Sequence, residues 1–442
     1  MIRRQRLVWG LRLAAARYRF KESLALFPAL MMVAGILLAL GTTAIDKALG
    51  PAADLPLTLS MSSQSAMWLL STVAGAMMTT AGVVFSLTVV SLQLASEQFS
   101  PRVMRSFIRD RVSQGVIGLL VATFFYCVLI LPSLSGEATD PAPPLSPTVA
   151  LILTLVTVLG IIVHLDHLSR GLQVGNLARV ISTEGQNLAV GFDTVPAGLR
   201  QIAEKASHAP RDAAVVRSET SGWVSQVDRA QALRAVPANT TVRLESRVGA
   251  YIHKGEVIFS IWPPPPAGCQ ERLAKTMEVA DARTMLQDVD FAIRQLVDIG
   301  LRALSPAVND PTTAVEIILR LGSLLRTLLT TSLAPATLGD SAGRVFMQPW
   351  NLDHQEYIEH AFEQLRQSCL TQPPVAAALL RVLRMLMEHV QEQGHPEHVG
   401  PLRRQVQLLT ESLHGQSGLH PEDLRYLALL TSDETDPADH SH

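Results

Sequence analysis

The stretch STVAGAMMTTAGVVFSLTVVSLQ, residues Ser71–Gln93, decides the fold class of this chain. It contains no charged residue and lies inside a longer uncharged window that runs from Leu55 to Ser96. A helix needs about 20 mainly apolar residues to cross the roughly 30 Å hydrocarbon core of a lipid bilayer. We therefore predict a transmembrane helix near residues 66–94.

Three further windows contain no charged residue: Ser23–Ile45, Val112–Gly136 and Pro141–Val163. They predict transmembrane helices near residues 24–44, 113–132 and 147–165. The whole chain has 442 residues, of which 48% are hydrophobic and 17% charged, and its mean hydropathy is +0.23. This composition is more apolar than that of an ordinary soluble protein. We expect a four-helix transmembrane domain over residues 1–170.

The basic residues predict the orientation of these helices, because cytoplasmic loops carry an excess of lysine and arginine. They lie before the first span and between the second and third: Arg3, Arg4, Arg6, Arg12, Arg17, Arg19, Lys21, Arg102, Arg105, Arg109 and Arg111. The other two loops hold Asp46, Lys47, Asp54, Glu137 and Asp140. We expect a bacterial inner-membrane protein with both termini in the cytoplasm. The alternative for the N-terminus, a cleaved signal peptide, is disfavoured by the length of the apolar stretch and the lack of a clear A-x-A site.

A stripe of small and polar residues follows the second span at mostly three- and four-residue spacing. Its members are Gly75, Thr79, Gly82, Ser86, Gln93 and Glu97. Small residues let membrane helices approach closely, so the stripe could be a helix-packing face. It could instead line a water-filled path around the axis of a homo-oligomer. The predicted spans contain no charged residue, which argues against a proton- or ion-coupled transporter.

Beyond the fourth span, helical periodicity predicts a connector over residues 171–213, and a Val-, Ile- and Thr-rich segment predicts strands over 214–262. The glycine spacing from Gly222 to Ile261 resembles the barrel-sandwich fold of lipoyl and biotinyl domains. Those domains attach their cofactor to a lysine at a hairpin tip. No lysine occurs between Gly222 and Arg247, and Lys254 lies in a different turn. We expect a small structural β module without a cofactor.

A polyproline linker, Pro263–Pro266, precedes a predicted helical domain over residues 270–413. The remaining segment, 414–442, is polar and acidic, and we expect it to be partly disordered. The predicted fold class is thus mixed: an α-helical membrane domain of four transmembrane helices, followed by a cytoplasmic α+β region.

The predicted helical domain contains a charge ladder that ends in a helix corner. Asp290, Arg294, Asp298 and Arg302 recur every four residues with alternating sign, so each lies close to the next on a helix. Ser305-Pro306 should end this helix, because a residue before proline is pushed out of helical geometry. Asn309-Asp310-Pro311 should begin the next one, with Asp310 as N-cap and Pro311 in the first turn.

Three segments resemble an uncharacterised family of bacterial predicted membrane proteins, catalogued as domain of unknown function 2254. They are FSLTVVSLQLASEQFSPRVMRSFIRD (Phe85–Asp110), SGWVSQVD (Ser221–Asp228) and RQLVDIGLRALSPAVNDPTTA (Arg294–Ala314). The resemblance covers most of the chain up to about residue 410. It implies four spans and a cytoplasmic C-terminal region, but no activity and no catalytic residues.

The residues themselves indicate no enzyme. There is no nucleophile–base set, no phosphate-binding glycine loop and no HExxH helix. An enzymatic alternative would use Asp288, Asp290, Asp298 and Asp310 with Ser305 as a polar neighbour, although such a ladder is more typical of a salt-bridged face or a subunit contact. We predict no catalytic residues, no metal site and no cofactor.

Other polar groups carry weaker signals. His164 and His167 share a helix face and could bind a metal or titrate, but anchoring at the membrane interface is the commoner role. His395-Pro-Glu-His398 is interpreted as surface loop. Cys127, Cys269 and Cys369 have no ligand spacing. A net charge of −2 gives no field that would attract nucleic acid.

Two functional hypotheses follow, with a third ranked last. The first is a homo-oligomeric channel or pore with a cytoplasmic vestibule. The second is a non-conducting membrane-anchored sensor or scaffold that docks a cytoplasmic protein partner. The third is a membrane enzyme.

Overall fold

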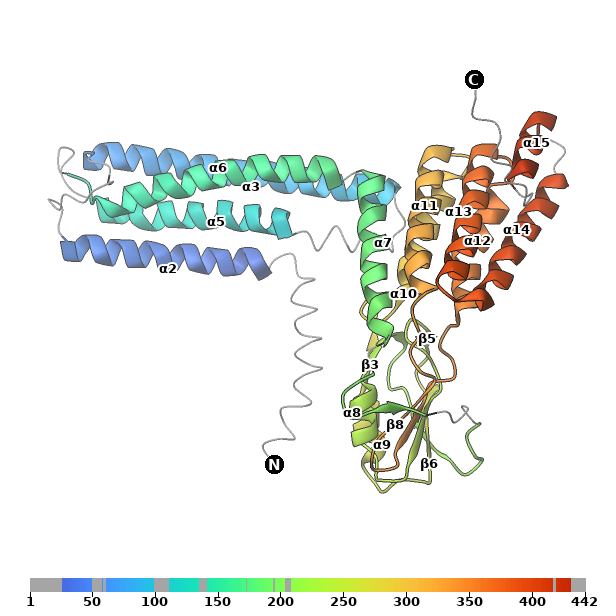
Figure 1. The fold of residues 1–442 in the computed structure, drawn as a ribbon. Coiled ribbons are helices and arrows are strands. Elements are labelled where there is room, and N and C mark those ends of the chain that lie inside the picture. Colours follow the sequence, from blue (N-terminus) through green and yellow to red (C-terminus); the bar gives the residue numbers. More distant parts are fainter. Residues whose placement is uncertain are drawn as a thin grey trace. The chain divides into compact units, whose positions relative to one another are not determined.

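The computed structural model describes residues 26–49, 58, 61–98, 111–134, 141–171, 173–193, 195–202, 208–415 and 419–430. The chain divides into two compact units, Met1–Gln173 and Val174–His442, and each is described here by itself (Figure 1).

The first unit contains four long helices, which confirms the predicted spans. They are α2 (Leu26–Leu49), α3 (Ser63–Gln98), α5 (Arg111–Ile130) and α6 (Leu145–Gly171). Each is long and apolar enough to cross a membrane. The N-terminal arginines and the arginine-rich loop after α3, which includes Pro101, lie outside the described residues.

Helix α5 holds the first unit together because it packs against α2, α3 and α6. Its residues Leu120, Tyr126 and Ile130 are fully buried in a shared apolar core. Glycines allow the closest approach: a Cβ atom on Gly35 of α2 would lie 2.7 Å from the Ala122 carbonyl oxygen, and one on Gly118 of α5 would overlap α2.

Helix α2 carries a buried acidic residue near its C-terminal end, beyond the predicted span 24–44. Helix α2 continues beyond residue 44 to Leu49 and therefore includes Asp46, which is buried. The Asp46 carboxylate accepts hydrogen bonds from the backbone amides of Leu145 (3.0 Å) and Ser146 (2.9 Å). The first amides of a helix have no partner within the helix, so this carboxylate caps α6.

The second unit contains two β-sheets. The six-stranded sheet has the order β1-β8-β9-β4-β6-β2 and the three-stranded sheet the order β5-β3-β7. The strands are β1 (Arg200–Gln201), β2 (Ala214–Arg217), β3 (Gly222–Val227), β4 (Thr241–Leu244), β5 (Tyr251–Ile252), β6 (Val257–Trp262), β7 (Met277–Ala280), β8 (Thr337–Gly339) and β9 (Val345–Met347). Strand β4 pairs with β9 in parallel and with β6 in antiparallel orientation.

The predicted barrel-sandwich module is not found among the described residues, which form no closed barrel. Strands β7, β8 and β9 come from outside segment 214–262 and complete the two sheets. Phe346 of β9 lies fully buried in the same core as Phe259 of β6. Segment 214–262 does not form a closed module because β4 would then be an edge strand. Without β9, its backbone groups on one side would be unpaired and part of this core would be uncovered.

Nine helices of the second unit fall within the described residues. They are α7 (Val174–Val190), α8 (Arg229–Arg234), α9 (Cys269–Ala274), α10 (Val289–Ala303), α11 (Pro311–Leu328), α12 (His354–Ser368), α13 (Pro373–Glu392), α14 (Val399–His414) and α15 (Pro421–Leu429). Helix α10 packs against α7, α11 and α12, and α13 packs against α11 and α14. Figure 1 shows α7 and α10 to α15 side by side, with the strands, α8 and α9 gathered at one end of them. Helix α15 lies in the segment expected to be partly disordered, of which residues 431–442 lie outside the described residues.

Candidate functional site

The predicted stripe on α3 faces away from the chain's own helices. Gly75, Thr79, Gly82, Ser86 and Gln93 are all exposed in the single chain. A Cβ atom added to Gly75 or Gly82 would meet nothing within 4 Å. The stripe therefore does not serve packing within the chain, unlike the glycines between α2 and α5. The backbone at Glu97 is helical, but its side chain lies outside the described residues.

The outward face of α6 has a different composition. Between residues 151 and 163 its exposed residues are Leu151, Ile152, Leu155, Val156, Val158, Leu159, Ile162 and Val163. Such a surface suits lipid chains. On α3, Ser71 and Thr72 are also exposed and extend the polar stripe by one turn. The exposed surface of α3 is thus mixed, since it also carries the apolar residues Met78, Val83, Phe85 and Val90 beside the stripe.

The α3 stripe has the spacing of a helix-association seam. Thr72, Gly75, Thr79, Gly82 and Ser86 follow one another at alternating intervals of three and four residues. This heptad spacing keeps one face of a helix against a neighbouring helix over several turns. Small residues in such a seam let two membrane helices come close together.

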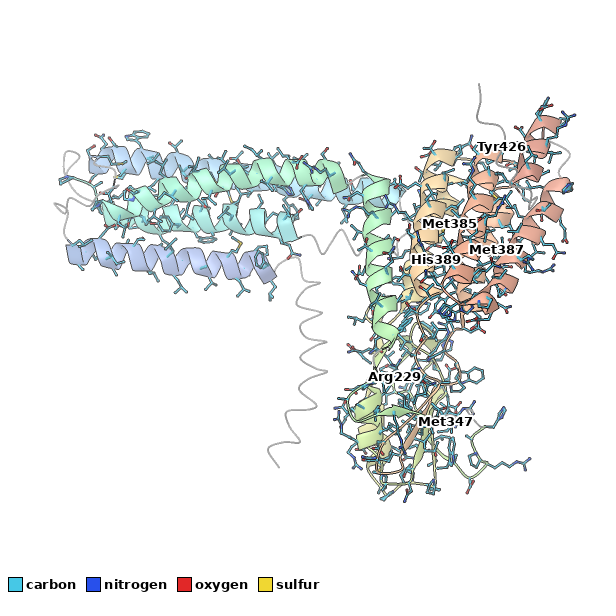
Figure 2. The ribbon with its side chains drawn as sticks, viewed as in Figure 1. Arg229, Met347, Met385, Met387, His389 and Tyr426 are labelled. Carbon is cyan, nitrogen blue, oxygen red and sulfur yellow. The ribbon has the colours of Figure 1, made fainter. Side chains whose placement is uncertain are left out.

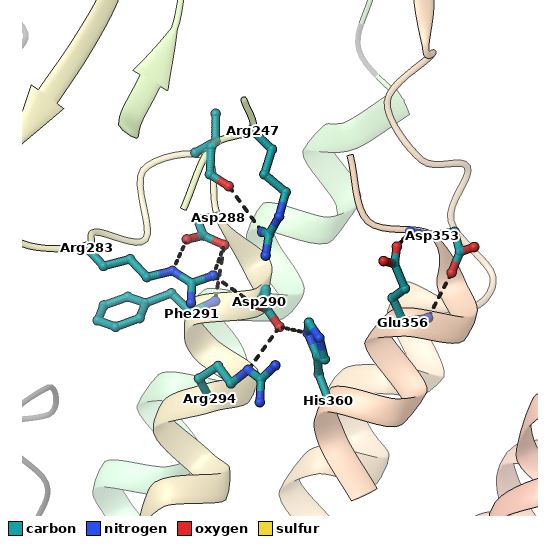
Figure 3. A network of polar contacts seen from close by, with 10 residues as sticks. Arg247, Arg283, Asp288, Asp290, Phe291, Arg294, Asp353, Glu356 and His360 are labelled. Carbon is teal, nitrogen blue, oxygen red and sulfur yellow. Dashed lines mark hydrogen bonds and ion pairs between the residues drawn. The ribbon is translucent and has the colours of Figure 1, made fainter. Parts of the chain in front are cut away.

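Asp290, at the start of α10, is the most buried charged residue among the described residues of the second unit, and several polar side chains surround it (Figure 3). The Asp290 cluster comprises Arg283, Asp288, Asp290, Arg294 and His360. Arg283 donates to both oxygens of Asp288, from Nε at 2.5 Å and from Nη2 at 3.0 Å. Its Nη2 also donates to Asp290 at 2.8 Å.

Two helices meet at the second oxygen of Asp290. His360 of α12 places its Nδ1 at 2.7 Å from Asp290 Oδ1, and Arg294 places its Nε at 3.8 Å from the same oxygen. Asp288 is in turn the N-cap of α10 and accepts a hydrogen bond from the Phe291 amide. The cluster therefore joins the α10 N-terminus to α12.

The two carboxylates have opposite pKa shifts. Burial raises the pKa of Asp288 above its usual range despite the guanidinium of Arg283 beside it. Burial also acts to raise the pKa of Asp290, but hydrogen bonds from His360 and Arg283 outweigh it and hold that pKa well below its usual range. Asp290 is thus a fixed negative charge on which the surrounding cations converge.

A small cavity of about 50 Å³ lies next to this cluster, with Arg229, Arg247, Asp288 and Tyr357 among its lining residues. Arg229, labelled in Figure 2, donates from its Nε to the side-chain oxygen of Gln348 at 2.9 Å. One water needs at least about 10–15 Å³, so this space suits a few waters. Ligand pockets are typically about 300–1,000 Å³, far larger than this cavity.

The charge ladder is buried only at its Asp290 end, since Asp298 is half-buried and Arg302 is exposed. The corner after it forms as predicted. Helix α10 ends at Ala303, α11 begins at Pro311, and Asp310 accepts from the backbone amide of Thr313 at 3.0 Å.

Two further corner residues have defined contacts. Asn309 adopts a left-handed backbone with φ of 45°, a conformation that asparagine tolerates better than most residues. Its side-chain oxygen accepts from Gln372, just before α13, at 3.0 Å. Ser305 donates its hydroxyl to the Arg302 carbonyl at 2.7 Å, and Pro306 is exposed.

The carboxylates of the enzymatic alternative do not form one site. Asp288 and Asp290 lie at the start of α10, which has 15 residues, and Asp310 lies beyond its other end. A helix rises about 1.5 Å per residue, so roughly 20 Å of helix separates them. The three cysteines are free and buried.

His164 and His167 do not share one environment. His164 is fully buried, with its Nδ1 3.3 Å from the Ser113 hydroxyl of α5. His167 is exposed. His164 thus contributes to packing between α5 and α6, whereas an anchoring role at the membrane interface stays a prediction for both histidines.

The family described as "Predicted membrane protein (DUF2254)" matches residues 21–385. The chain is 32% identical over 332 residues to the uncharacterized proteins Mb1321c of Mycobacterium bovis and Rv1290c of Mycobacterium tuberculosis, an alignment that covers 72% of this chain and 63% of each relative. The chain thus spans less than two thirds of the length of these relatives. No solved structure matches it. The chain belongs to the DUF2254 family of predicted membrane proteins.

Proposed function

We propose that this protein forms a homo-oligomeric channel in the bacterial inner membrane, with the α3 stripe around the central axis. The observation that carries the proposal is the outward position of Gly75, Thr79, Gly82, Ser86 and Gln93. A polar side chain such as Gln93 is costly in contact with hydrocarbon, so this face favours water or another protein surface over lipid.

The contrast between α3 and α6 supports the same arrangement. The outward residues of α6 between Leu151 and Val163 are all apolar and suit a lipid-facing helix, whereas α3 also presents a polar stripe that suits the interior of an assembly. The heptad spacing from Thr72 to Ser86 provides a seam along which α3 helices of neighbouring copies can pack. Residues farther along the stripe, toward Gln93, would then border the aqueous path.

The second unit would form a vestibule on the cytoplasmic side. The arginines before α2 and between α3 and α5 favour the cytoplasm for both loops. In that orientation the second unit, Val174–His442, would lie in the cytoplasm. We propose no catalytic role for the Asp290 cluster, whose carboxylates are held in ion pairs next to a cavity of about 50 Å³.

Cysteine accessibility tests the proposal, because all three native cysteines are buried. Thr79→Cys and Ser86→Cys place single thiols on the stripe, and Leu155→Cys and Leu159→Cys place matched thiols on the apolar face of α6. In proteoliposomes, a charged thiol reagent should modify the α3 variants and change the conductance. It should leave the α6 variants unmodified. Absence of both labelling and conductance at the two α3 positions would refute the channel.

A non-conducting scaffold is the second candidate, and one observation favours it. The corner between α10 and α11 presents exposed Arg302, Pro306 and Val308, and Val308 is 51% exposed. This surface could dock a cytoplasmic protein. Disulfide cross-linking through Thr79→Cys without conductance, together with a stoichiometric partner lost on Arg302→Ala, would support the scaffold over the channel.

A further inference from the structure

A cluster of metal-ligating side chains occupies the turn between α13 and α14. It consists of His395, Glu397 and His398, and the short 3₁₀ helix η3 (Pro396–His398) holds it in place. A 3₁₀ helix has three residues per turn, so side chains three residues apart lie above one another. The rings of His395 and His398 accordingly stack, with centroids 5.9 Å apart and planes inclined by 14°. We refer to these three residues as the His-Glu-His cluster.

Two of the three separations between ligand atoms of the cluster are close to those of a tetrahedral metal site. His395 Nδ1 lies 3.2 Å from Glu397 Oε1, and His398 Nε2 lies 3.6 Å from the same oxygen. One ligand atom from each of the three residues falls within 4.8 Å of the others. Zinc–nitrogen bonds of about 2.0–2.1 Å place tetrahedral ligands roughly 3.3 Å apart. Small side-chain rotations are therefore enough to converge the three groups on one ion.

A third histidine contacts the cluster from its buried side. His354, at the start of α12, has its Nε2 3.2 Å from the Leu328 carbonyl oxygen and 3.1 Å from that of Thr331. Both partners are acceptors, so Nε2 carries the proton and donates it. The His354 ring lies 4.2 Å from the His398 ring, centroid to centroid. This contact restricts the orientation of His398, as groups outside the ligand set commonly do at metal centres.

The cluster is closed on one side and open on the other. His398 is buried, whereas the Glu397 side chain is 59% exposed. A metal held between them could complete its coordination with water from the solvent side. Two imidazoles with one carboxylate are a ligand set found in zinc sites that keep a water position.

We propose that His395, Glu397 and His398 bind a divalent transition-metal ion, with zinc as the best match to the ligands and their spacing. The ion fixes the α13–α14 turn beside the ends of α11 and α12 that His354 joins. The site lies beyond residues 21–385 that the family matches, and it does not depend on the channel proposal.

Cobalt provides a direct test, since Co²⁺ replaces Zn²⁺ in tetrahedral sites and absorbs visible light there. Untagged full-length protein in detergent is titrated with Co²⁺ after treatment with a chelator. The expected result is a tetrahedral visible spectrum that saturates at one ion per chain and disappears when Zn²⁺ is added. Because loss of even a supporting group typically weakens metal binding about 10- to 100-fold, His395→Ala or His398→Ala should weaken it by at least about tenfold.

Matched variants keep the test decisive. His414→Ala and Glu388→Gln change exposed residues on α14 and α13 and should leave the affinity unchanged. His395→Ala and Glu397→Gln alter residues at the open side of the cluster, so they remain informative even where His398→Ala fails to fold. Absence of a tetrahedral spectrum would overturn the proposal, and so would an affinity that His395→Ala and Glu397→Gln leave unchanged.

Discussion

Replacing Asp290 by alanine removes the carboxylate on which three side chains of the second unit converge. Arg283 lies 2.8 Å from it, His360 2.7 Å and Arg294 3.8 Å, and the Asp290 side chain is only 2% exposed. In the variant, Arg283 keeps its two hydrogen bonds to Asp288. His360 loses its acceptor, and the link between α10 and α12 at this point is lost.

The expected cost can be bounded from these contacts. Removing one partner of a buried ion pair destabilises a protein by about 3–5 kcal/mol, because the other charge stays buried without compensation. The loss of stability in Asp290→Ala should be smaller than the upper value, because Arg283 keeps its ion pair with Asp288. In addition, the side chains of Arg283 and His360 are 13% and 23% exposed to water. We therefore expect the lower end of that range, about 3 kcal/mol.

Cys369 reports this loss directly. It is fully buried at the C-terminal end of α12, the helix that carries His360, and burial raises the pKa of its thiol to about 12. A thiol reagent should reach it only when α12 opens. When reclosing is fast, the labelling rate follows the population of the open state. A loss of about 3 kcal/mol should therefore accelerate labelling roughly 100-fold, measured by mass spectrometry of the Cys369 peptide.

Two variants control the measurement. Asp290→Asn keeps the shape but removes the charge, and it should also accelerate labelling strongly. Glu363→Ala removes an exposed carboxylate from α12 itself and should change the rate less than about threefold. An acceleration below about fivefold in Asp290→Ala would show that the cluster does not hold α12 in place.

Three further predictions concern the same unit, each read from Cys369 labelling or denaturant unfolding. Gly249 has φ of +81°, and a Cβ there would overlap the Asp288 carboxylate, so Gly249→Ala should lower the free energy of unfolding by more than about 2 kcal/mol. Gly255 has φ of +87° but nothing within 4 Å of an added Cβ, so Gly255→Ala should lower it by only about 1 kcal/mol. The pKa of Asp290 is lower in the folded than in the unfolded state. The ionised carboxylate therefore contributes fully to the free energy of unfolding above the unfolded pKa of about 3.9, and this contribution is lost as the pH falls through the pKa of the folded state. The difference between wild type and Asp290→Ala should thus be constant from pH 5 to 7 and shrink below about pH 4. Asp310→Ala should cost about 1 kcal/mol through loss of the α11 cap, and Asp310→Asn should restore most of it.

The parts of the fold that were predictable from sequence depend on local signals. An uncharged window long enough to cross a bilayer identifies its helix without knowledge of any partner. Pro306 and Pro311 likewise constrain their own backbone and that of the preceding residue. Asp310 caps α11 through the backbone amide of a residue only three positions later in the chain. These elements were found at or within a few residues of the expected positions.

The parts that were not predictable depend on contacts between distant residues. His360 meets Asp290 across 70 positions of sequence. From the sequence alone, without the packing of α12 on α10, Asp290 is indistinguishable from the other charged residues of the ladder. Strand β9 pairs with β4 although the two strands lie about 100 residues apart in the sequence. The glycine spacing around Gly222 carries no signal for this pairing and therefore predicted a self-contained β module, which the described residues do not form.

The open face of α3 allows a substitution whose effect separates assembly from folding. Gly82 is exposed in the single chain and has no atom within 4 Å of an added Cβ, so we expect Gly82→Leu to leave the fold of the single chain intact. Gly35 is the matched contrast, since its Cβ would lie 2.7 Å from the Ala122 carbonyl oxygen, and Gly35→Leu should prevent α2 from packing on α5. Because close contact along a seam depends on small residues, Gly82→Leu should disrupt the oligomer or alter its conductance while the monomer stays folded. Size-exclusion chromatography with light scattering and single-channel recording measure the two effects. If Gly82→Leu changes neither, α3 faces lipid in the native protein and the channel proposal fails.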